Sequence, residues 1–191
     1  MKGTRSLTDS EYRNACNSFS GRYATRDRAL FVLCYRTGFR VSEALSLQIG
    51  DVLQYGKIVE RVSVERRHTK GKRSGRTVPL HREAREALAH WLEKLRADGH
   101  LTGSLFRSQK GGAMTRVQAH RVYASAFDMA SLQGKLGTHC ARKSFAQRMY
   151  SALDRDLIKT QRALGHANVN STVSYLDGCE HEVESAILDA A

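Results

Sequence analysis

The sequence predicts a mainly α-helical domain with a small antiparallel β-sheet, an α+β fold class, and three observations lead to it. Apolar residues recur three or four positions apart over most of the chain, as they do on one face of a helix. Between residues 51 and 80 the spacing changes to the alternation typical of strands. The 191 residues include one proline and no internal repeat or Gly/Ser-rich linker, which favours a single domain over residues 1–191.

Three helices are expected before the sheet. The sequence "TDSE" at residues 8–11 fits a capping box that opens the first helix. The second runs through residues 26–38, and Gly38 is well suited to end it. A short third helix, "RVSEALSLQ" at residues 40–48, follows at once. The apolar stripe of the second helix consists of Ala29, Leu30, Leu33 and Cys34.

The sheet is expected from two β-rich stretches and the turn between them. Residues 57–65, "KIVERVSVE", alternate apolar and polar side chains, and residues 76–80, "RTVPL", are short and β-rich. The glycine-containing segment that joins them carries most of the local positive charge, so we expect a hairpin with a basic tip. Helices resume at residues 82–97, and helical patterns continue from Gly112 to the end of the chain.

The charge balance indicates a polyanionic partner. Lys and Arg outnumber Asp and Glu by 31 to 19, which gives a formal net charge of +12 and a pI near 9.9. A domain this basic most often binds nucleic acid, although many basic proteins only carry solvated charges. The distribution sharpens the prediction, because residues 61–76 hold seven Lys or Arg whereas the last fifteen residues hold five acids and neither Lys nor Arg.

Several other classes of protein are disfavoured. No apolar run approaches the length of a membrane helix, and the first residues lack the apolar core of a secretory signal, so we expect a cytoplasmic protein with no membrane partner. The four cysteines are scattered and form no CxxC pair, which argues against a zinc site and favours free thiols.

Two motifs in the first half of the chain suggest phosphate chemistry. Arg40 and Glu43 are three residues apart, so they share a helix face and can pair. A guanidinium fixed by a carboxylate is suited to bidentate phosphate binding, but an ordinary surface ion pair has the same spacing. The expected hairpin tip carries Lys70 and Lys72; lysines at turns are usually solvated, yet such a tip can also enter a DNA groove and donate a proton.

Two further motifs lie in the second half. His139 and Arg142 are three residues apart at an expected helix N-terminus, where backbone N–H groups favour an anion, although such a pair is more often structural. His166 and Tyr175 are nine residues apart across a turn after Gly165, which can bring an imidazole and a phenol to one small site. The alternative for Tyr175 is a packing role.

Together and in this order, these motifs resemble the catalytic domain of the tyrosine recombinases, the phage integrase family. The matching boxes read "TGFRVSE", "TKGKRSGRTVPL", "THCARKSFA" and "LGHANVNSTVSYL", and they span most of the chain, from Thr37 to Leu176. The resemblance implies a tyrosine recombinase catalytic-domain fold. It also implies a site-specific DNA recombinase or integrase that cleaves and rejoins DNA strands through a 3′-phosphotyrosyl intermediate, with no cofactor and no metal.

The resemblance also implies a role for each matching residue. Tyr175 would attack the phosphorus, Lys70 would protonate the departing 5′-oxygen, and His139 would assist proton transfer at the tyrosine. Glu43 would orient Arg40 or a neighbouring histidine. The implied catalytic set is Arg40, Lys70, His139, Arg142, His166 and the nucleophile Tyr175, with Glu43 and Lys72 in support. Further DNA contacts are expected from Arg66, Arg67, Lys72, Arg73, Arg76 and Lys143.

The sequence departs from the family pattern in two places. The stretch after Lys70 is one residue longer than the commonest family hairpin, so Lys72 is the alternative general acid. The N-terminal core-binding domain that is usual in the family is absent from these residues, so we expect weak, strongly salt-dependent DNA binding by the chain alone. The acidic tail, about residues 178–191, carries apolar positions and either exchanges between protomers or packs on its own domain.

The expected partner is double-stranded DNA. By the resemblance, we expect a homotetramer on paired DNA sites and a monomer without DNA, and accessory DNA-bending proteins are further candidate partners. Two alternatives use the same residues: a type IB topoisomerase-like enzyme that relaxes DNA, and a non-catalytic DNA-binding module derived from a recombinase. An RNA-binding domain has only the net charge in its favour, since the chain lacks an aromatic-rich stacking strand.

Overall fold

The computed structural model describes residues 4–65, 75–176 and 188, and the chain forms two compact units, residues 1–145 and 146–191. The boundary falls within α7 (His139–Ala152). The second unit also holds α8 (Leu157–Leu164) and α9 (Asn170–Val173). The first unit holds α1 (Asp9–Ser18), α2 (Ala24–Thr37), α3 (Val41–Leu45), α4 (Ile49–Val52), β1 (Leu53–Gln54), β2 (Lys57–Ile58), β3 (Arg61–Val64), β4 (Arg76–Pro79), α5 (Arg82–Ala97) and α6 (Arg116–Met129).

The expected capping box at the start of α1 is confirmed. The Thr8 hydroxyl accepts from the Glu11 backbone N–H at 3.2 Å, and the Glu11 carboxylate accepts from the Thr8 backbone N–H at 2.9 Å. The Glu11 carboxylate also pairs with Arg5, whose side chain donates to the carbonyl of Gln133 at 2.9 Å. Residues before α1 are therefore tied to the loop that leads into α7.

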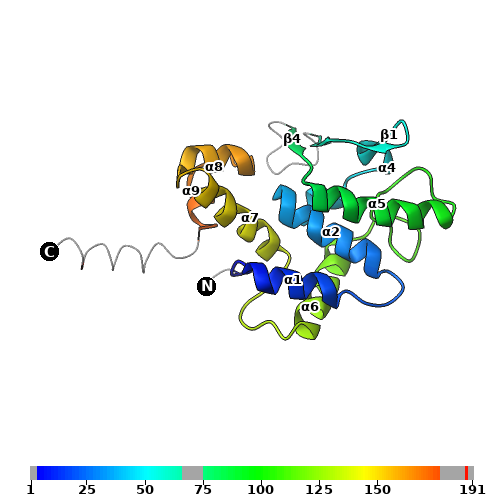
Figure 1. Ribbon diagram of the computed structural model, residues 1–191, viewed down its shortest axis with the longest axis horizontal. Helices are drawn as coiled ribbons and strands as arrows, with labels where there is room; N and C mark the ends of the chain where they lie inside the picture. The colour runs from blue at the N-terminus through cyan, green and yellow to red at the C-terminus, as the bar shows by residue number, and fades with distance from the viewer. Residues whose placement is uncertain (1–3, 66–74, 177–187, 189–191) are drawn as a thin grey trace. The chain divides into compact units, whose positions relative to one another are not determined.

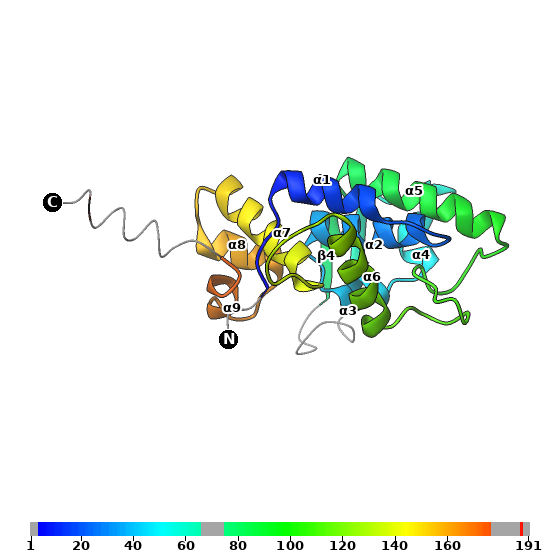
Figure 2. The same ribbon diagram turned by 90° about the horizontal axis from the view of Figure 1, so that it is seen from below.

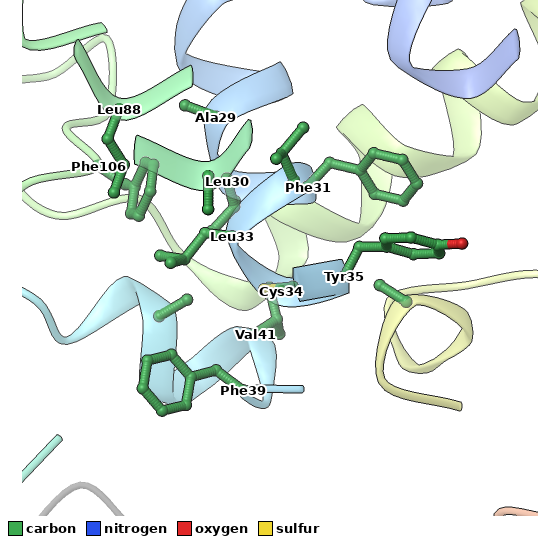
Figure 3. Close-up of a cluster of buried hydrophobic side chains, with 14 of the residues drawn as sticks. Ala29, Leu30, Phe31, Leu33, Cys34, Tyr35, Phe39, Val41, Leu88 and Phe106 are labelled. Atoms are coloured by element: carbon green, nitrogen blue, oxygen red, sulfur yellow. The ribbon is translucent and has the colours of Figure 1, made fainter. Parts of the chain in front are cut away.

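Helix α2 forms the centre of the first unit. It contacts α1, α3, α5 and α6, which surround it in Figures 1 and 2. Nearly all its residues from Ala29 to Tyr35 are inaccessible to water, because it has neighbours on every side. Figure 3 shows Leu33 on the side of Leu88 and Phe106, while Phe31 and Tyr35 point to the opposite side. The expected stripe thus belongs to a stretch of helix, Ala29 to Tyr35, that is buried on every side.

The end of α2 brings the chain back towards the core. Gly38 adopts a left-handed conformation with φ 64°, and its N–H donates to the Cys34 carbonyl. A side chain here would also overlap the ring of Phe145, so the position requires glycine for two reasons. The expected stop at Gly38 is confirmed, and it places the start of α3 beside the core.

The β-structure is divided more finely than expected. The hairpin of β3 and β4 is antiparallel, with Val62 opposite Val78 and Val64 opposite Arg76. The stretch expected as one strand instead contains β2 and β3, and β2 pairs with the short strand β1 through a turn at Tyr55 and Gly56. Both turn residues have positive φ, as tight two-residue hairpins require. The α+β class is confirmed, and the described residues form two small sheets in place of one.

In the second unit, the structure confirms the expected end of α8. Gly165 adopts a left-handed conformation with φ 63°, and the His166 N–H donates to the Gln161 carbonyl. Helix α9 follows within a few residues and contacts α8. Among all the helices described, none is both long and apolar enough to cross a membrane.

Candidate active site

Arg40 and Glu43 form the pair that their spacing predicts. Arg40 is the N-cap of α3, and its Nη1 donates to Glu43 Oε1 at 2.7 Å while its backbone N–H donates to Glu43 Oε2 at 2.8 Å. The Glu43 side chain is 3% exposed, whereas that of Arg40 is 22% exposed. The carboxylate is thus buried beneath a guanidinium that still reaches solvent, which fixes the guanidinium without covering it.

Arg142 joins this pair from the first turns of α7. Its side chain is buried, with 1% exposed, and its Nη1 donates to the carbonyl of Gly38 and lies 3.7 Å from Glu43 Oε2. A buried guanidinium requires hydrogen-bond acceptors and a nearby counter-charge. The end of α2 supplies the first, and Glu43 supplies the second.

Arg76, the first residue of β4, is the third guanidinium of the group. Its Nη2 donates to the Thr37 carbonyl at 2.8 Å, and its Nη1 lies 3.4 Å from the Gly38 carbonyl. Burial, together with the positive charges of Arg142 and Arg40, lowers the pKa of Arg76 to about 9, against the opposing effect of Glu43. The sequence predicted Arg76 only as a DNA contact, since nothing local shows that it turns towards α2.

These contacts define an arginine cluster, which consists of Arg40, Arg76 and Arg142 around Glu43. Three guanidinium groups and one carboxylate leave an excess of two positive charges in a largely buried region. Such an excess disfavours the empty site and favours any anion that approaches the exposed side of Arg40. The arrangement therefore suits the binding of a phosphate group.

The other predicted residues at the start of α7 differ in exposure. His139 is exposed in the first turn, although Arg142, one turn later, is buried. Lys143 is half-buried. The helical spacing therefore brings His139 and Arg142 to the same end of α7 without giving them the same environment.

In the second unit, His166 and Tyr175 come together across the turn after α8. Their ring centroids lie 5.1 Å apart at an interplanar angle of 62°, an edge-to-face arrangement. His166 is buried, and its Nδ1 lies 3.0 Å from the hydroxyl oxygen of the fully buried Thr172. Gln161 Nε2 also donates to the His166 carbonyl at 2.9 Å. The imidazole is thus held from α9, and Tyr175 is half-buried beside it.

Thr172 is a site residue that sequence reasoning missed. Threonine in a polar run carries no signal of its own, and only the return of the chain through α9 brings its hydroxyl to the imidazole. Hydrogen bonding at one ring nitrogen fixes the orientation of a histidine ring. Thr172 therefore determines how His166 presents its other nitrogen.

Some predicted residues lie outside the described part of the chain. They are Arg66, Arg67, Lys70, Lys72 and Arg73, and the tail from residue 178 apart from Leu188. Within the described ranges, no three His, Cys, Asp or Glu side chains are grouped so that they could hold a metal ion.

Comparisons with known sequences identify related proteins. The sequence model described as "Phage integrase family" matches residues 5–181. Tyrosine recombinase XerD of Mycobacterium tuberculosis is 33% identical over 159 residues, which cover 81% of this chain and 49% of the relative. Tyrosine recombinase XerC of Bacillus subtilis is 34% identical over 155 residues, which cover 78% and 48%. The chain thus spans about half the length of the curated relatives it matches.

Comparisons with solved structures support the same fold. The XerH site-specific recombinase, bound to a palindromic difH substrate in a post-cleavage complex, gives a TM-score of 0.76 at 30% identity. The alignment covers 99% of this chain and 54% of that one. XerA recombinase gives a TM-score of 0.77 at 23% identity and covers all of this chain and 65% of that one, which supports the fold alone. The expected catalytic-domain fold is confirmed.

Proposed function

Because this chain belongs to the phage integrase family, we propose that it cleaves and rejoins DNA strands in site-specific recombination through a 3′-phosphotyrosyl intermediate. The observation that carries the proposal is the arginine cluster, whose excess positive charge suits a phosphodiester. The match covers about half the length of the relatives named recombinases, so the activity is proposed for the chemistry of this catalytic part.

The reaction is a transfer of the phosphorus from one oxygen to another. The Tyr175 hydroxyl loses its proton and its oxygen bonds to the phosphorus, while the bond from phosphorus to the 5′-oxygen breaks. The 5′-oxygen takes up a proton from Lys70, or from Lys72 in the alternative assignment, and His139 assists removal of the tyrosine proton. Attack by a 5′-hydroxyl of a second duplex then reverses these steps and rejoins the strand.

The fixed cations act on the charge that develops during this transfer. A phosphodiester carries one negative charge, and its pentacoordinate transition state gains a second. Arg40 and Arg142 would hold the non-bridging oxygens, and His166 would donate a further hydrogen bond to them. Because Glu43 and the Gly38 carbonyl already hold the guanidinium groups, little reorganisation accompanies the reaction. Each such donor contributes a factor of about 10² to 10³ in rate.

The proposed substrate is double-stranded DNA, and the proposed active assembly is a homotetramer on two paired sites. The substrate is supported by the net charge of +12 and by the similarity to the XerH recombinase, which is bound to a difH substrate. A single nucleophile, Tyr175, cleaves one strand, so exchange between two duplexes requires four chains, each cleaving one strand.

Covalent trapping tests the proposal. A library of nicked duplexes with a randomised core is incubated with the chain; the nick lets a short 5′-hydroxyl fragment diffuse away, which traps the adduct. Adducts are recovered after denaturation and sequenced. We expect adducts for the wild type and none for Tyr175→Phe, whose missing hydroxyl cannot form the bond, and a loss of at least about 100-fold for Arg142→Ala.

The outcomes separate the rival functions. Adduct formation with strand joining to a second duplex supports a recombinase, whereas adducts that lead only to relaxation of supercoiled DNA indicate a topoisomerase-like enzyme. DNA binding without any Tyr175-dependent adduct would sink the proposal in favour of a non-catalytic module.

A further inference from the structure

Arg76 lies where the basic hairpin meets the body of the first unit. It pairs with Val64 in the register of β3 and β4, and it is the first residue of β4 after the segment that carries Lys70 and Lys72. Unlike an ordinary strand-end arginine, it is largely buried and its guanidinium is directed back to the end of α2. Binding DNA from the base of the hairpin would not require the guanidinium to be buried and directed inwards.

The contacts of Arg76 converge on the segment that links α2 to α3. It donates to the Thr37 carbonyl, lies within reach of the Gly38 carbonyl, and has its guanidinium carbon 5.3 Å from the centre of the Phe39 ring. The Gly38 carbonyl is also the acceptor for Arg142. One side chain thus contacts three successive residues that immediately precede Arg40 in the chain.

The chemistry of these contacts argues against a simple structural role. Two backbone carbonyls need only neutral donors, and an arginine placed beside Arg40 and Arg142 adds electrostatic repulsion. The lowered pKa of Arg76 reflects its burial first and this repulsion second. Charges that destabilise the empty protein are typical of sites that receive the opposite charge from a substrate.

Direct DNA binding explains the geometry less well. The guanidinium of Arg76 is largely buried, donates to the Thr37 carbonyl and lies near the Phe39 ring, so it is directed towards the segment before Arg40. Arg76 does add a third positive charge near Arg40 and Arg142. The low dielectric of the buried region strengthens the electrostatic interaction among these charges.

We propose that Arg76 is a positioning residue of the reaction, which fixes the Gly38 carbonyl that holds Arg142 and adds positive charge behind the arginine pair. This inference rests on the proposed function, because it assigns Arg76 to the same phosphate site. In this role Arg76 acts through Arg142 and Arg40.

The test separates binding from chemistry. Single-turnover adduct formation is measured at saturating DNA for Arg76→Met, Arg76→Gln and Arg76→Lys, on a suicide duplex recovered with the wild type. We expect the Met and Gln variants to react about 10- to 100-fold more slowly, with Kd for DNA within about threefold of the wild type, because positioning affects the transition state more than binding. Thermal melting identifies the variants that fold, and Gln, the more conservative replacement, retains a donor for the Thr37 carbonyl.

The pH dependence of the rate of Arg76→Lys distinguishes an electrostatic role from a purely structural one. Lysine restores the charge, and we expect it to recover most of the rate near pH 7. Because Arg40 and Arg142 repel a third cation more than Glu43 attracts it, the lysine should lose its proton more readily than an arginine. The rate relative to the wild type should therefore fall as the pH rises from 7 to about 8, below the pKa of about 9 at which Arg76 itself loses its proton, while that ratio for Arg76→Met stays flat over the same range.

Arg61→Met is the matched control, since Arg61 is exposed in the paired strand β3, and it should react at the wild-type rate. If the wild type forms no Tyr175-dependent adduct, the proposed function fails and the inference fails with it. If the wild type reacts and folded Arg76→Met or Arg76→Gln matches its rate, only the inference is overturned. A loss of DNA affinity without a loss of rate at saturation also overturns it, and assigns Arg76 to DNA binding.

Discussion

At the scale of single residues, Glu43 is the group on which the arginine cluster depends. Its carboxylate accepts from both the side chain and the backbone N–H of Arg40, and it lies near Arg142. Removing the counter-charge of a buried guanidinium greatly lowers the free energy of unfolding, whereas removing one partner of an exposed ion pair changes it little. The chain offers both cases for comparison.

We predict that Glu43→Gln lowers the free energy of unfolding by about 3 kcal/mol, because the amide keeps the shape but leaves the neighbouring guanidinium groups uncompensated. Urea unfolding measures this change. The matched control is Glu86→Gln, which removes the exposed partner of Arg82 at 3.4 Å, and it should change the free energy by less than about 0.5 kcal/mol. Equal effects in the two variants would mean that Glu43 is not the counter-charge of the cluster.

Residue-scale prediction from sequence succeeded where partners are close in the chain. The pairing of Arg40 with Glu43 follows from a spacing of three on a helix. Arg76 and Thr172 escaped because their partners are brought to them by a hairpin and by a turn between helices, and such returns of the chain leave no local pattern. Contacts between residues far apart in the chain depend on tertiary structure, and the local spacing of residues in one sequence does not predict them.

At the scale of elements, the segment before α1 is held by an ion pair that responds to pH. Hydrogen bonding to Arg5 lowers the pKa of Glu11 from 4.5 to about 2. A carboxyl whose pKa is lower in the folded state contributes stability that is complete above pH 4.5 and is lost as the pH falls towards 2.

We predict that Glu11→Gln lowers the free energy of unfolding at pH 7, because it removes the charge that pairs with Arg5. The loss should be only about 1 to 2 kcal/mol, since solvent reaches the pair and screens it. Glutamine preserves the capping box, so the charge alone is removed. Urea unfolding between pH 7 and pH 2.5 should show the difference from wild type shrinking as the pH falls. In the background of Arg5→Met most of this pH dependence should disappear, and a difference that persists there would contradict the assignment to Arg5.

The end of α2 provides a second element-scale prediction. In Gly38→Ala, the new methyl group meets the ring of Phe145 and the backbone must keep a φ of 64°. We expect a loss of at least about 2 kcal/mol in the free energy of unfolding, from backbone strain and steric overlap together. Gly56→Ala is the control, since its φ is 75° but open space surrounds it, and it should cost about 1 kcal/mol. Equal losses would show that Phe145 relaxes freely.

The sequence predicted elements well where their ends carry chemical markers. The capping box of α1 and the glycines that end α2 and α8 were all readable. Helix α4 and the hairpin of β1 and β2 were not, because four-residue and two-residue elements are too short to establish a periodicity. Tertiary contacts hold them, as with the Ile49 N–H that donates to the carbonyl of Gly103.

At the scale of the whole molecule, the net charge is expected to govern how the chain binds its proposed substrate, DNA. With a formal charge of +12, attraction to phosphates acts before any specific contact forms. Each cation that neutralises a phosphate releases bound counterions, so the affinity falls with salt in proportion to the number of such contacts. The salt dependence therefore counts phosphate contacts even when the sequence of the site is unknown.

We predict that the affinity of the chain for a random duplex falls about 10- to 100-fold between 50 and 200 mM salt, as expected for a few phosphate contacts. Lys143→Met should reduce the slope of log K against log salt by about one, because Lys143 follows Arg142 at the start of α7 and is proposed to bind the DNA backbone. Fluorescence anisotropy across a salt series measures both slopes. Lys94→Met is the matched control, since Lys94 lies in the last turn of α5, the end that points away from β4 in Figures 1 and 2. An unchanged slope for Lys143→Met would remove Lys143 from the DNA interface, and an equal drop in both variants would mean that the chain binds by overall charge alone.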